Sequence, residues 1–134
     1  MAAPLFLTLA EVIEVHADQL ARYGGQMGVR DFGLLESALA QPEASFAGEW
    51  LHNDLYEKTS AYAYHLSQNH PFIDGNKRAA LACALIFLKL NGVRIRDPKG
   101  RLKDAMLRVA SGKMQKAEFA QVLRGLFTDD ADAT

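Results

Sequence analysis

The residue types that could perform chemistry concentrate in one stretch of nine residues, HPFIDGNKR at positions 70–78. His70 is a titratable base, and Asp74 follows it four residues later. A carboxylate together with phosphate oxygens is a suitable set of ligands for Mg²⁺. Lys77 and Arg78 then add two positive charges. A base, a metal-binding carboxylate and a cationic pair this close together favour phosphoryl transfer, which depends mainly on positioning and charge neutralisation.

This stretch lies where one predicted helix, residues 54–69, ends and another, residues 75–91, begins. Two basic residues in the first turn of a helix are unfavourable by themselves, because that end carries a partial positive charge. A bound anion would compensate for them. Free amides at a helix start point outward, and Gly75 allows a ligand to approach the backbone closely. With the Asn76 amide and the two cations, the helix start becomes a candidate phosphate cradle.

Each of these residues also has a simpler explanation. Asp74 could be a helix N-cap, and Gly75 could mark a turn. Lys77 and Arg78 could form a solvated face, and His70 before a proline could be an ordinary loop residue. The residues alone therefore leave two interpretations open, an anion site and a crowded helix start.

The elements that must position this stretch are helical. The sequence Thr8 to Glu11 has the form of a capping box, and glycines at 24–25 end the helix that it starts. A second helix begins at Asp31 and stops before Pro42. Further predicted helices cover residues 54–69, 75–91, 101–110 and 116–127. The helix over 75–91 is apolar around most of its circumference, which predicts that the other helices wrap it.

Two segments lack a clear helical period. Residues 42–53 carry Phe46 and Trp50, and we interpret them as a loop with a short hairpin. Residues 93–96 read as a short extended piece. The fold class predicted is all-α, a compact single domain over residues 1–134 with a central apolar helix, in which the acidic tail 128–134 is disordered.

Composition narrows the function classes. Hydrophobic residues make up 49% of the chain and charged residues 23%, as in ordinary globular proteins, and the net charge of -1 argues against direct nucleic-acid binding. The longest apolar run, residues 79–88, is about half of the ~20 residues needed to cross a bilayer. We therefore expect no membrane association, and the N-terminus lacks the features of a signal peptide. The single cysteine, Cys83, fits a buried thiol in a reducing compartment, so we expect a cytoplasmic protein.

The remaining histidines show no metal-site spacing. His16 falls on the apolar face of the first helix and is expected to be a core histidine with its hydrogen bonds satisfied. His52 and His65 are expected to be structural or exposed. No zinc pattern is present in the sequence.

The stretch at 70–78 resembles the signature of the Fic/Doc superfamily, HPFx(D/E)GN(G/K)R, at all nine positions. LARYGG at 20–25 and FLKLNGV at 87–93 also resemble the Doc (death-on-curing) branch of that superfamily. The resemblance covers roughly residues 9–127, and it implies the compact Fic/Doc helical fold, with one short hairpin as a flap.

The resemblance implies a role for each residue of the signature. His70 would be the general base that takes the proton of an acceptor hydroxyl, and Asp74 would hold Mg²⁺. The nucleotide phosphates of ATP would be bound by Gly75, Asn76, Lys77 and Arg78. Phe72 would anchor the loop in the core. The Trp50 region would be the flap that lays the target segment beside the nucleotide.

Two departures from the commonest Fic pattern bear on the reaction. Lys77 replaces a glycine, and Leu81 replaces an arginine that usually follows three residues after Arg78. In adenylylating members, that glycine makes room for the inner phosphates and that arginine holds the terminal ones. Both departures are shared with Doc-type toxins, which bind ATP in the reverse orientation and transfer the γ-phosphate. The resemblance thus implies a kinase that phosphorylates a threonine of elongation factor Tu and inhibits translation.

The same resemblance implies a partner. Doc-type toxins are neutralised by a Phd-like antitoxin, whose C-terminal segment lies in a groove on the toxin. An internal inhibitory helix of the pattern (S/T)xxxE(G/N) is not found in the sequence, which agrees with control by a separate protein. Two alternatives stay open: an adenylyltransferase that uses the same site, and a non-catalytic binding partner or co-repressor of an antitoxin.

Overall fold

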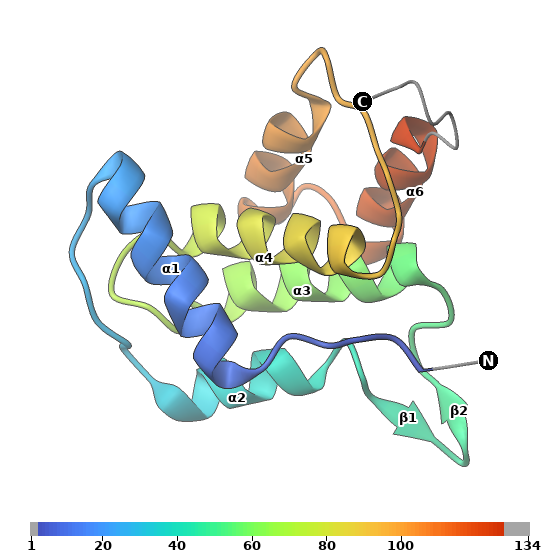
Figure 1. Cartoon of the computed structure of the whole chain (residues 1–134), viewed down its shortest axis with the longest axis horizontal. Helices are drawn as coiled ribbons and strands as arrows, with labels where there is room; N and C mark the ends of the chain where they lie inside the picture. Colours follow the sequence, from blue (N-terminus) through green and yellow to red (C-terminus); the bar gives the residue numbers. More distant parts are fainter. Residues whose placement is uncertain (1–2, 128–134) are drawn as a thin grey trace.

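The computed structural model describes residues 3–127, so the predicted disordered tail, residues 128–134, lies outside the described residues. Figure 1 shows an all-helical domain with one small hairpin, which confirms the predicted fold class. The elements are α1 (Leu9–Tyr23), α2 (Phe32–Ala40), β1 (Ser45–Phe46), β2 (Glu49–Trp50), α3 (Leu55–Asn69), α4 (Asn76–Leu90), α5 (Arg101–Ala110) and α6 (Lys116–Leu126).

Helix boundaries follow local capping chemistry. The backbone N–H of Glu11 donates to Thr8 Oγ1 at 3.1 Å, and its carboxylate accepts from the Thr8 N–H, which completes the predicted capping box. Asp31 and Asp54 each cap a helix, α2 and α3, through a carboxylate oxygen, and Asp54 also forms a capping box with Glu57. Gly24 ends α1 with a φ of 81°. These signals depend on neighbouring residues only, which is why the sequence predicted them.

The antiparallel pair of α3 and α4 forms the centre of the molecule (Figure 1). Helix α1 packs on α4, α2 packs on α3, and α5 and α6 pack against α3 on the side away from α2. The core between them contains Val12, Leu35, Tyr62, Leu66, Phe72, Phe87, Val109, Phe119 and Leu123, all 1% exposed or less. Cys83 lies in this core as predicted, and burial raises the pKa of its thiol to about 12.

Helix α3 is buried around more of its circumference than its polar sequence suggests. Every residue from 58 to 63 is buried, including Thr59 and Ser60. Their hydroxyls donate to the carbonyls of Leu55 and Tyr56, one turn earlier, at 2.7 Å in both cases. Hydroxyls that bond within their own helix need no outside partner, so α3 can enter the core despite its composition.

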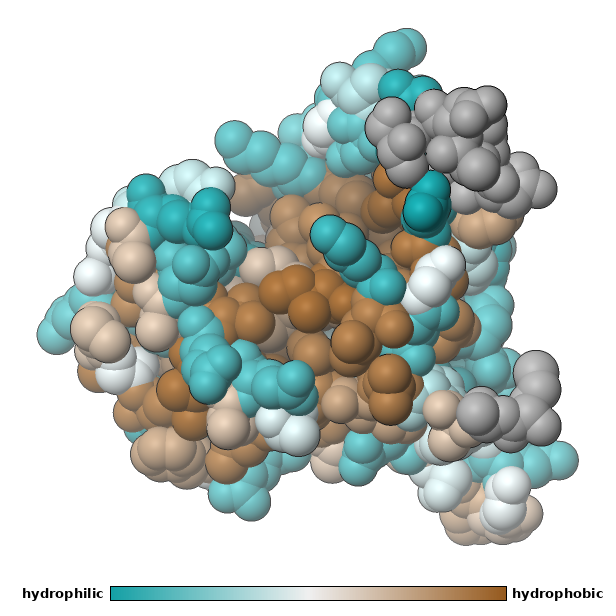
Figure 2. Space-filling view, viewed as in Figure 1, coloured by the Kyte–Doolittle hydropathy of each residue, from teal (hydrophilic) through white to brown (hydrophobic). Residues whose placement is uncertain are grey.

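Helix α4 is central, but the prediction that other helices wrap it holds only in part. Ile86 and Leu90 are 40% and 45% exposed, and Leu81 and Leu85 are half-buried. Figure 2 shows the result, an apolar surface over the middle of the molecule. Within residues 3–127, no helix has the length and apolar character that crossing a membrane requires.

The predicted hairpin exists, with Ser45 opposite Trp50, but its expected position as a flap beside the nucleotide site is wrong. The Trp50 ring packs 5.7 Å from the Phe6 ring and 4.5 Å from the Lys58 ammonium, at the N-terminal end of α3. The stretch at 70–78 begins where α3 ends. Fifteen helical residues, about 22 Å, therefore separate the two. Figure 1 shows the hairpin at the lower right and the α3–α4 loop at the left.

A group of basic side chains joins α3 to the start of α6. The Lys116 ammonium lies 3.0 Å from His65 Nε2 and 3.2 Å from His52 Nε2. An ammonium can only donate, so both imidazoles accept and are neutral in this arrangement. Burial, then the charge of Lys116, lowers the pKa of His65 to about 4 and also lowers the pKa of His52. His52 and His65 are therefore structural, as expected.

Acidification should weaken the packing of α6 on α3. The pKa of His65 lies below the ordinary value of 6.5 in the folded state, so its stabilising effect is complete above pH 6.5 and is lost as the pH falls towards 4. We expect the free energy of unfolding, measured by urea denaturation, to fall by about 1 to 2 kcal/mol between pH 7 and pH 5. His65→Gln keeps an acceptor for Lys116 without titrating and should reduce this dependence. An equal dependence in wild type and variant would contradict the assignment.

Candidate active site

The connection between α3 and α4 is a short loop, and we call residues 70–75 the site loop. His70 is the C-cap of α3, is exposed, and has left-handed backbone angles, φ 47° and ψ 54°. Glycine usually takes this conformation at a helix end, because a side chain strains it by about 1 to 2 kcal/mol. Asp74 and Gly75 close the loop at the start of α4. The predicted base and the predicted cradle thus lie at the two ends of one rigid connection.

Phe72 anchors the site loop in the core. Its ring is 1% exposed and stacks on the His16 ring, with 3.7 Å between centroids and 6° between planes. His16 Nε2 lies 2.7 Å from the Asp74 carbonyl, and because a carbonyl only accepts, this nitrogen carries the proton. His16 is buried and hydrogen-bonded, as predicted for a core histidine. Its partner, however, is the backbone of the candidate site.

The Asn76 side chain also holds the loop closed. Its Oδ1 accepts from the Phe72 N–H at 2.9 Å, and its Nδ2 donates to the Phe72 carbonyl at 3.0 Å. The sequence had suggested that this amide faces a phosphate. In the structure the side chain is bound to the loop, so the backbone N–H is the group that Asn76 offers to an anion.

A second segment, residues 24–31 between α1 and α2, runs along the site loop, and we call it the pairing segment. Val29 forms an antiparallel bridge with Phe72, and the Ile73 N–H donates to the Gly28 carbonyl at 3.0 Å. The Arg30 N–H donates to the Pro71 carbonyl at 2.7 Å. The pairing segment, and not the hairpin, is therefore the element that lies against the site. Figure 1 shows it at the left edge of the molecule, outside the α3–α4 loop.

The Asp74 carboxylate is exposed and held by two backbone donors. The Gln26 N–H donates to Oδ2 at 3.1 Å, and the Gly75 N–H donates to Oδ1 at 2.8 Å. These bonds, the one from Gln26 first, hold the pKa of Asp74 below its ordinary value, so the group is ionised at neutral pH. Its oxygens keep lone pairs for a further ligand.

The start of α4 is an open cationic end. Gly75 is its N-cap with a φ of 74°, and no side chain accepts from the first amides. Lys77 is exposed in the first turn. Arg78 is fixed by α1, since its Nη2 donates to the Gly24 carbonyl at 2.9 Å and its guanidinium lies 5.7 Å from the Tyr23 ring centre. Free amides and two cations at one helix start form a suitable anion site.

These residues fit a magnesium–nucleotide ligand. Mg²⁺ prefers one or two carboxylates completed by waters and phosphate oxygens. Asp74 supplies one ionised carboxylate next to the anion site, whereas no group of three or more His, Cys, Asp or Glu side chains gathers anywhere in residues 3–127. An ion at Asp74 would therefore depend on the phosphates of a bound nucleotide.

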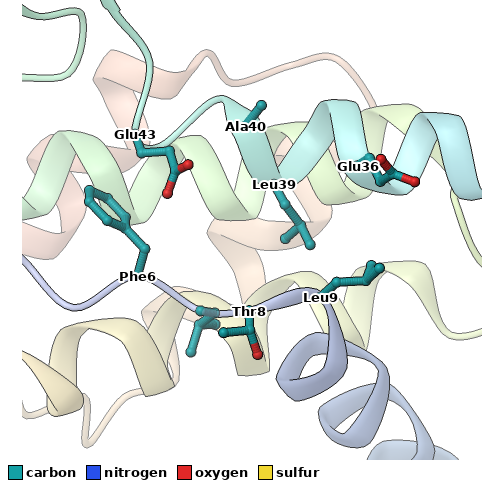
Figure 3. A pocket seen from close by; sticks show the side chains of 8 residues that line it. Phe6, Thr8, Leu9, Glu36, Leu39, Ala40 and Glu43 are labelled. Carbon is teal, nitrogen blue, oxygen red and sulfur yellow. The ribbon is translucent and has the colours of Figure 1, made fainter.

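Two hollows of the surface lie away from the site loop. One, about 430 Å³, lies between the N-terminal segment and α2, where the Phe6 ring extends towards Glu43 and the Leu39 side chain points from α2 towards the N-terminal segment (Figure 3). A larger groove of about 890 Å³ follows α4 and the chain after it, and we call it the α4 groove. It is lined by Leu81, Leu85, Leu88, Lys89, Gly92, Val93, Arg94, Ile95, Arg96, Asp97, Leu102 and Lys103. Neither includes a residue of the site loop, so shape alone would not have found the candidate site.

The structure thus brings the predicted site residues, His70, Phe72 and positions 74–78, onto one loop and one helix start. Sequence reasoning missed the residues that hold them. Arg30 and Gln26 bond to the site loop from the pairing segment, and His16 bonds to it from α1. No local signal could have found the first two, because each bond joins residues at least 40 positions apart.

Known proteins resemble this chain over more than half of its length. A family model described as "Fic/DOC family" matches residues 6–88, more than half of the chain. A protein named "Toxin Doc", from Mycolicibacterium smegmatis, is 38% identical over 105 residues, which cover 77% of this chain and 81% of that protein. "Protein kinase doc", from Escherichia phage P1, is 36% identical over 117 residues, which cover 87% of this chain and 91% of that protein.

Substitution of Gly25 tests the contact between the pairing segment and the site loop. A Cβ at Gly25 would lie 2.7 Å from Leu20 Cδ2 and 3.0 Å from Asp74 Oδ2, and its φ is +127°. We expect Gly25→Ala to lower the free energy of unfolding by about 2 to 3 kcal/mol and to weaken Mg-ATP binding in calorimetry. In the control, Gly92→Ala, a Cβ meets nothing within 4 Å, so only the strain of its positive φ, about 1 kcal/mol, is expected. Equal effects on ATP binding would contradict a role of this contact.

Proposed function

Because the chain belongs to the Fic/DOC family, in its Doc branch, we propose that it is a Doc-type toxin that transfers the γ-phosphate of Mg-ATP to a hydroxyl of a target protein. The observation that carries the proposal is the uncapped start of α4. Ionised Asp74, the free first amides and the Lys77–Arg78 pair meet there, one short loop away from His70. Phosphoryl transfer requires little more from a protein than this positioning and charge.

Each residue has one task in this reaction. The amides of α4 with Lys77 and Arg78 bind the phosphates. Asp74 would hold Mg²⁺, which would supply positive charge to the phosphate oxygens. His70 accepts the proton of the acceptor hydroxyl as its oxygen attacks the γ-phosphorus. The bond from that phosphorus to the β–γ bridging oxygen breaks, and ADP leaves with the bonding electrons.

Transfer of phosphate, and not of AMP, is supported by two side chains. Lys77 is exposed in the first turn of α4, where a glycine would leave space for inner phosphates. Leu81, one turn further, is half-buried and apolar, so it offers no charge to terminal phosphates. Both favour a nucleotide bound with its γ-phosphate, not its α-phosphate, presented to the acceptor. The proposed target is a threonine of elongation factor Tu in the bacterial cytoplasm.

The first test is transfer of label to purified elongation factor Tu from ATP labelled at the γ- or the α-phosphate. We expect γ-label only, and a loss of about 10²- to 10⁴-fold in the rate for His70→Ala, because the general base is gone. Circular dichroism should show an unchanged helical fold in that variant. Transfer of α-label would contradict the kinase and favour adenylylation. A folded protein that binds no Mg-ATP and transfers neither label would favour the non-catalytic alternative.

We further propose that the α4 groove binds the C-terminal segment of a Phd-like antitoxin. Its floor is apolar, and Figure 2 shows this surface exposed between α1 and the α5–α6 end. Four cations surround it: Lys89, Arg94, Arg96 and Lys103. The carboxylate of Asp97, the acidic residue in the lining, accepts from the first two backbone N–H groups of α5 at 2.7 and 2.9 Å. Among residues 3–127, no acidic group lies within 4.0 Å of the four cations. An acidic amphipathic helix is the complementary partner.

Charge reversal separates this groove from the chemistry. We expect Arg94→Glu combined with Arg96→Glu to weaken binding of an antitoxin peptide by about 10-fold or more in calorimetry, while γ-phosphate transfer is kept. Lys113→Glu is the control and should leave peptide binding unchanged, because this exposed residue is not part of the groove. Unchanged peptide affinity in the double variant would place the antitoxin elsewhere.

A further inference from the structure

The Arg30 side chain lies at the C-terminal end of α3. Its Nε donates to the His70 carbonyl at 2.7 Å, and its Nη2 donates to the Asn69 carbonyl at 3.0 Å. The last carbonyls of a helix have no partner within the helix and carry its partial negative charge. A guanidinium can satisfy two of them at once with charge-assisted bonds in a fixed geometry. Arg30 therefore caps α3 from another part of the chain.

His70, whose carbonyl accepts from Arg30, has a strained backbone. Within residues 3–127, only His70 and Ala47 combine a side chain with a positive φ, and Ala47 lies in the hairpin turn. A left-handed histidine persists only where its surroundings over-determine the backbone. Here the carbonyls of three consecutive residues, 69 to 71, accept from Arg30, through its side chain for the first two and its N–H for the third.

We propose that Arg30 is a positioning residue which keeps His70 in its left-handed conformation and so aims the imidazole at the acceptor hydroxyl. The direction of the Cα–Cβ bond follows from φ and ψ, so a relaxed residue 70 would point its ring elsewhere. This inference rests on the proposed role of His70 as general base. Arg30 makes no hydrogen bond to residues 74–78, which are proposed to hold Mg-ATP.

A purely structural cap makes a different prediction. Loss of a purely structural cap would lower the free energy of unfolding, while each folded molecule would keep the wild-type kcat. A positioning residue affects the rate of transfer at saturating ATP, because a small displacement of a catalytic group reduces the rate strongly. The ATP site would stay intact, so the KM for ATP should remain unchanged.

Three variants of the full chain test this, Arg30→Ala, Arg30→Met and Arg30→Lys, with γ-phosphate transfer as the readout. We expect kcat to fall by about 10- to 100-fold in Arg30→Ala and Arg30→Met, with the KM for ATP within about twofold of wild type. Arg30→Lys keeps the charge but loses the paired donors, so an intermediate kcat is expected. Added guanidinium should restore transfer in part to Arg30→Ala, and should not restore it to His70→Ala.

Arg22→Met is the matched control, because this exposed arginine pairs with Asp18 within α1 at 2.8 Å and should leave kcat unchanged. A second readout is independent of activity. The carbon chemical shifts of residue 70 report its backbone angles in solution, and they should move from left-handed values in Arg30→Met and stay in Arg22→Met. If these shifts do not move in Arg30→Met, or if its kcat equals that of Arg22→Met, Arg30 does not position His70. A wild-type protein that transfers no γ-label would instead refute the proposed function, and the shifts would still decide what Arg30 does.

Discussion

The shape of the candidate site depends on the antiparallel contact between the site loop and the pairing segment. A short exposed loop between two helices has several backbone groups that water could solvate in many conformations, so it does not by itself keep one shape. Here Val29 and Phe72 pair, the Arg30 N–H donates to the Pro71 carbonyl, and the Gly28 carbonyl accepts from the Ile73 N–H. These bonds favour the observed conformation of the loop without a ligand, and preorganised groups are the ones that stabilise transferred charge efficiently.

The energy that maintains this conformation comes from the core. Burial of the Phe72 side chain contributes about 2 to 3 kcal/mol, which exceeds the strain of about 1 to 2 kcal/mol at left-handed His70. One face of the His16 ring stacks on Phe72, and Nε2 at the edge of the ring donates to the Asp74 carbonyl. A strained residue with a free side chain beside a buried anchor is the pattern expected where function imposes a conformation that local preference opposes.

The limits of sequence reasoning follow the range of the interactions. Thr8, Asp31 and Asp54 cap their helices through residues three positions away, so the helix starts were predictable from neighbours alone. The chemical stretch was predictable as well, because its residues are adjacent in the chain. The partners of the site loop come from distant segments of the chain, and no sequence spacing predicts them. The Trp50 region was misplaced for the same reason. The resemblance implied a flap beside the nucleotide, but nothing in the sequence says at which end of α3 the hairpin lies.

Helix α4 connects the proposed chemistry with the proposed control. Its first turn forms the candidate anion site, and from Leu81 onward its apolar face lines the α4 groove. Leu81 lies four residues after Lys77, about one helical turn or 6 Å along the axis. A partner helix that covers Leu81 would therefore lie about one helical turn from the proposed phosphate site. The open apolar strip, which is unfavourable for an isolated domain, becomes reasonable once such a partner completes the packing around α4.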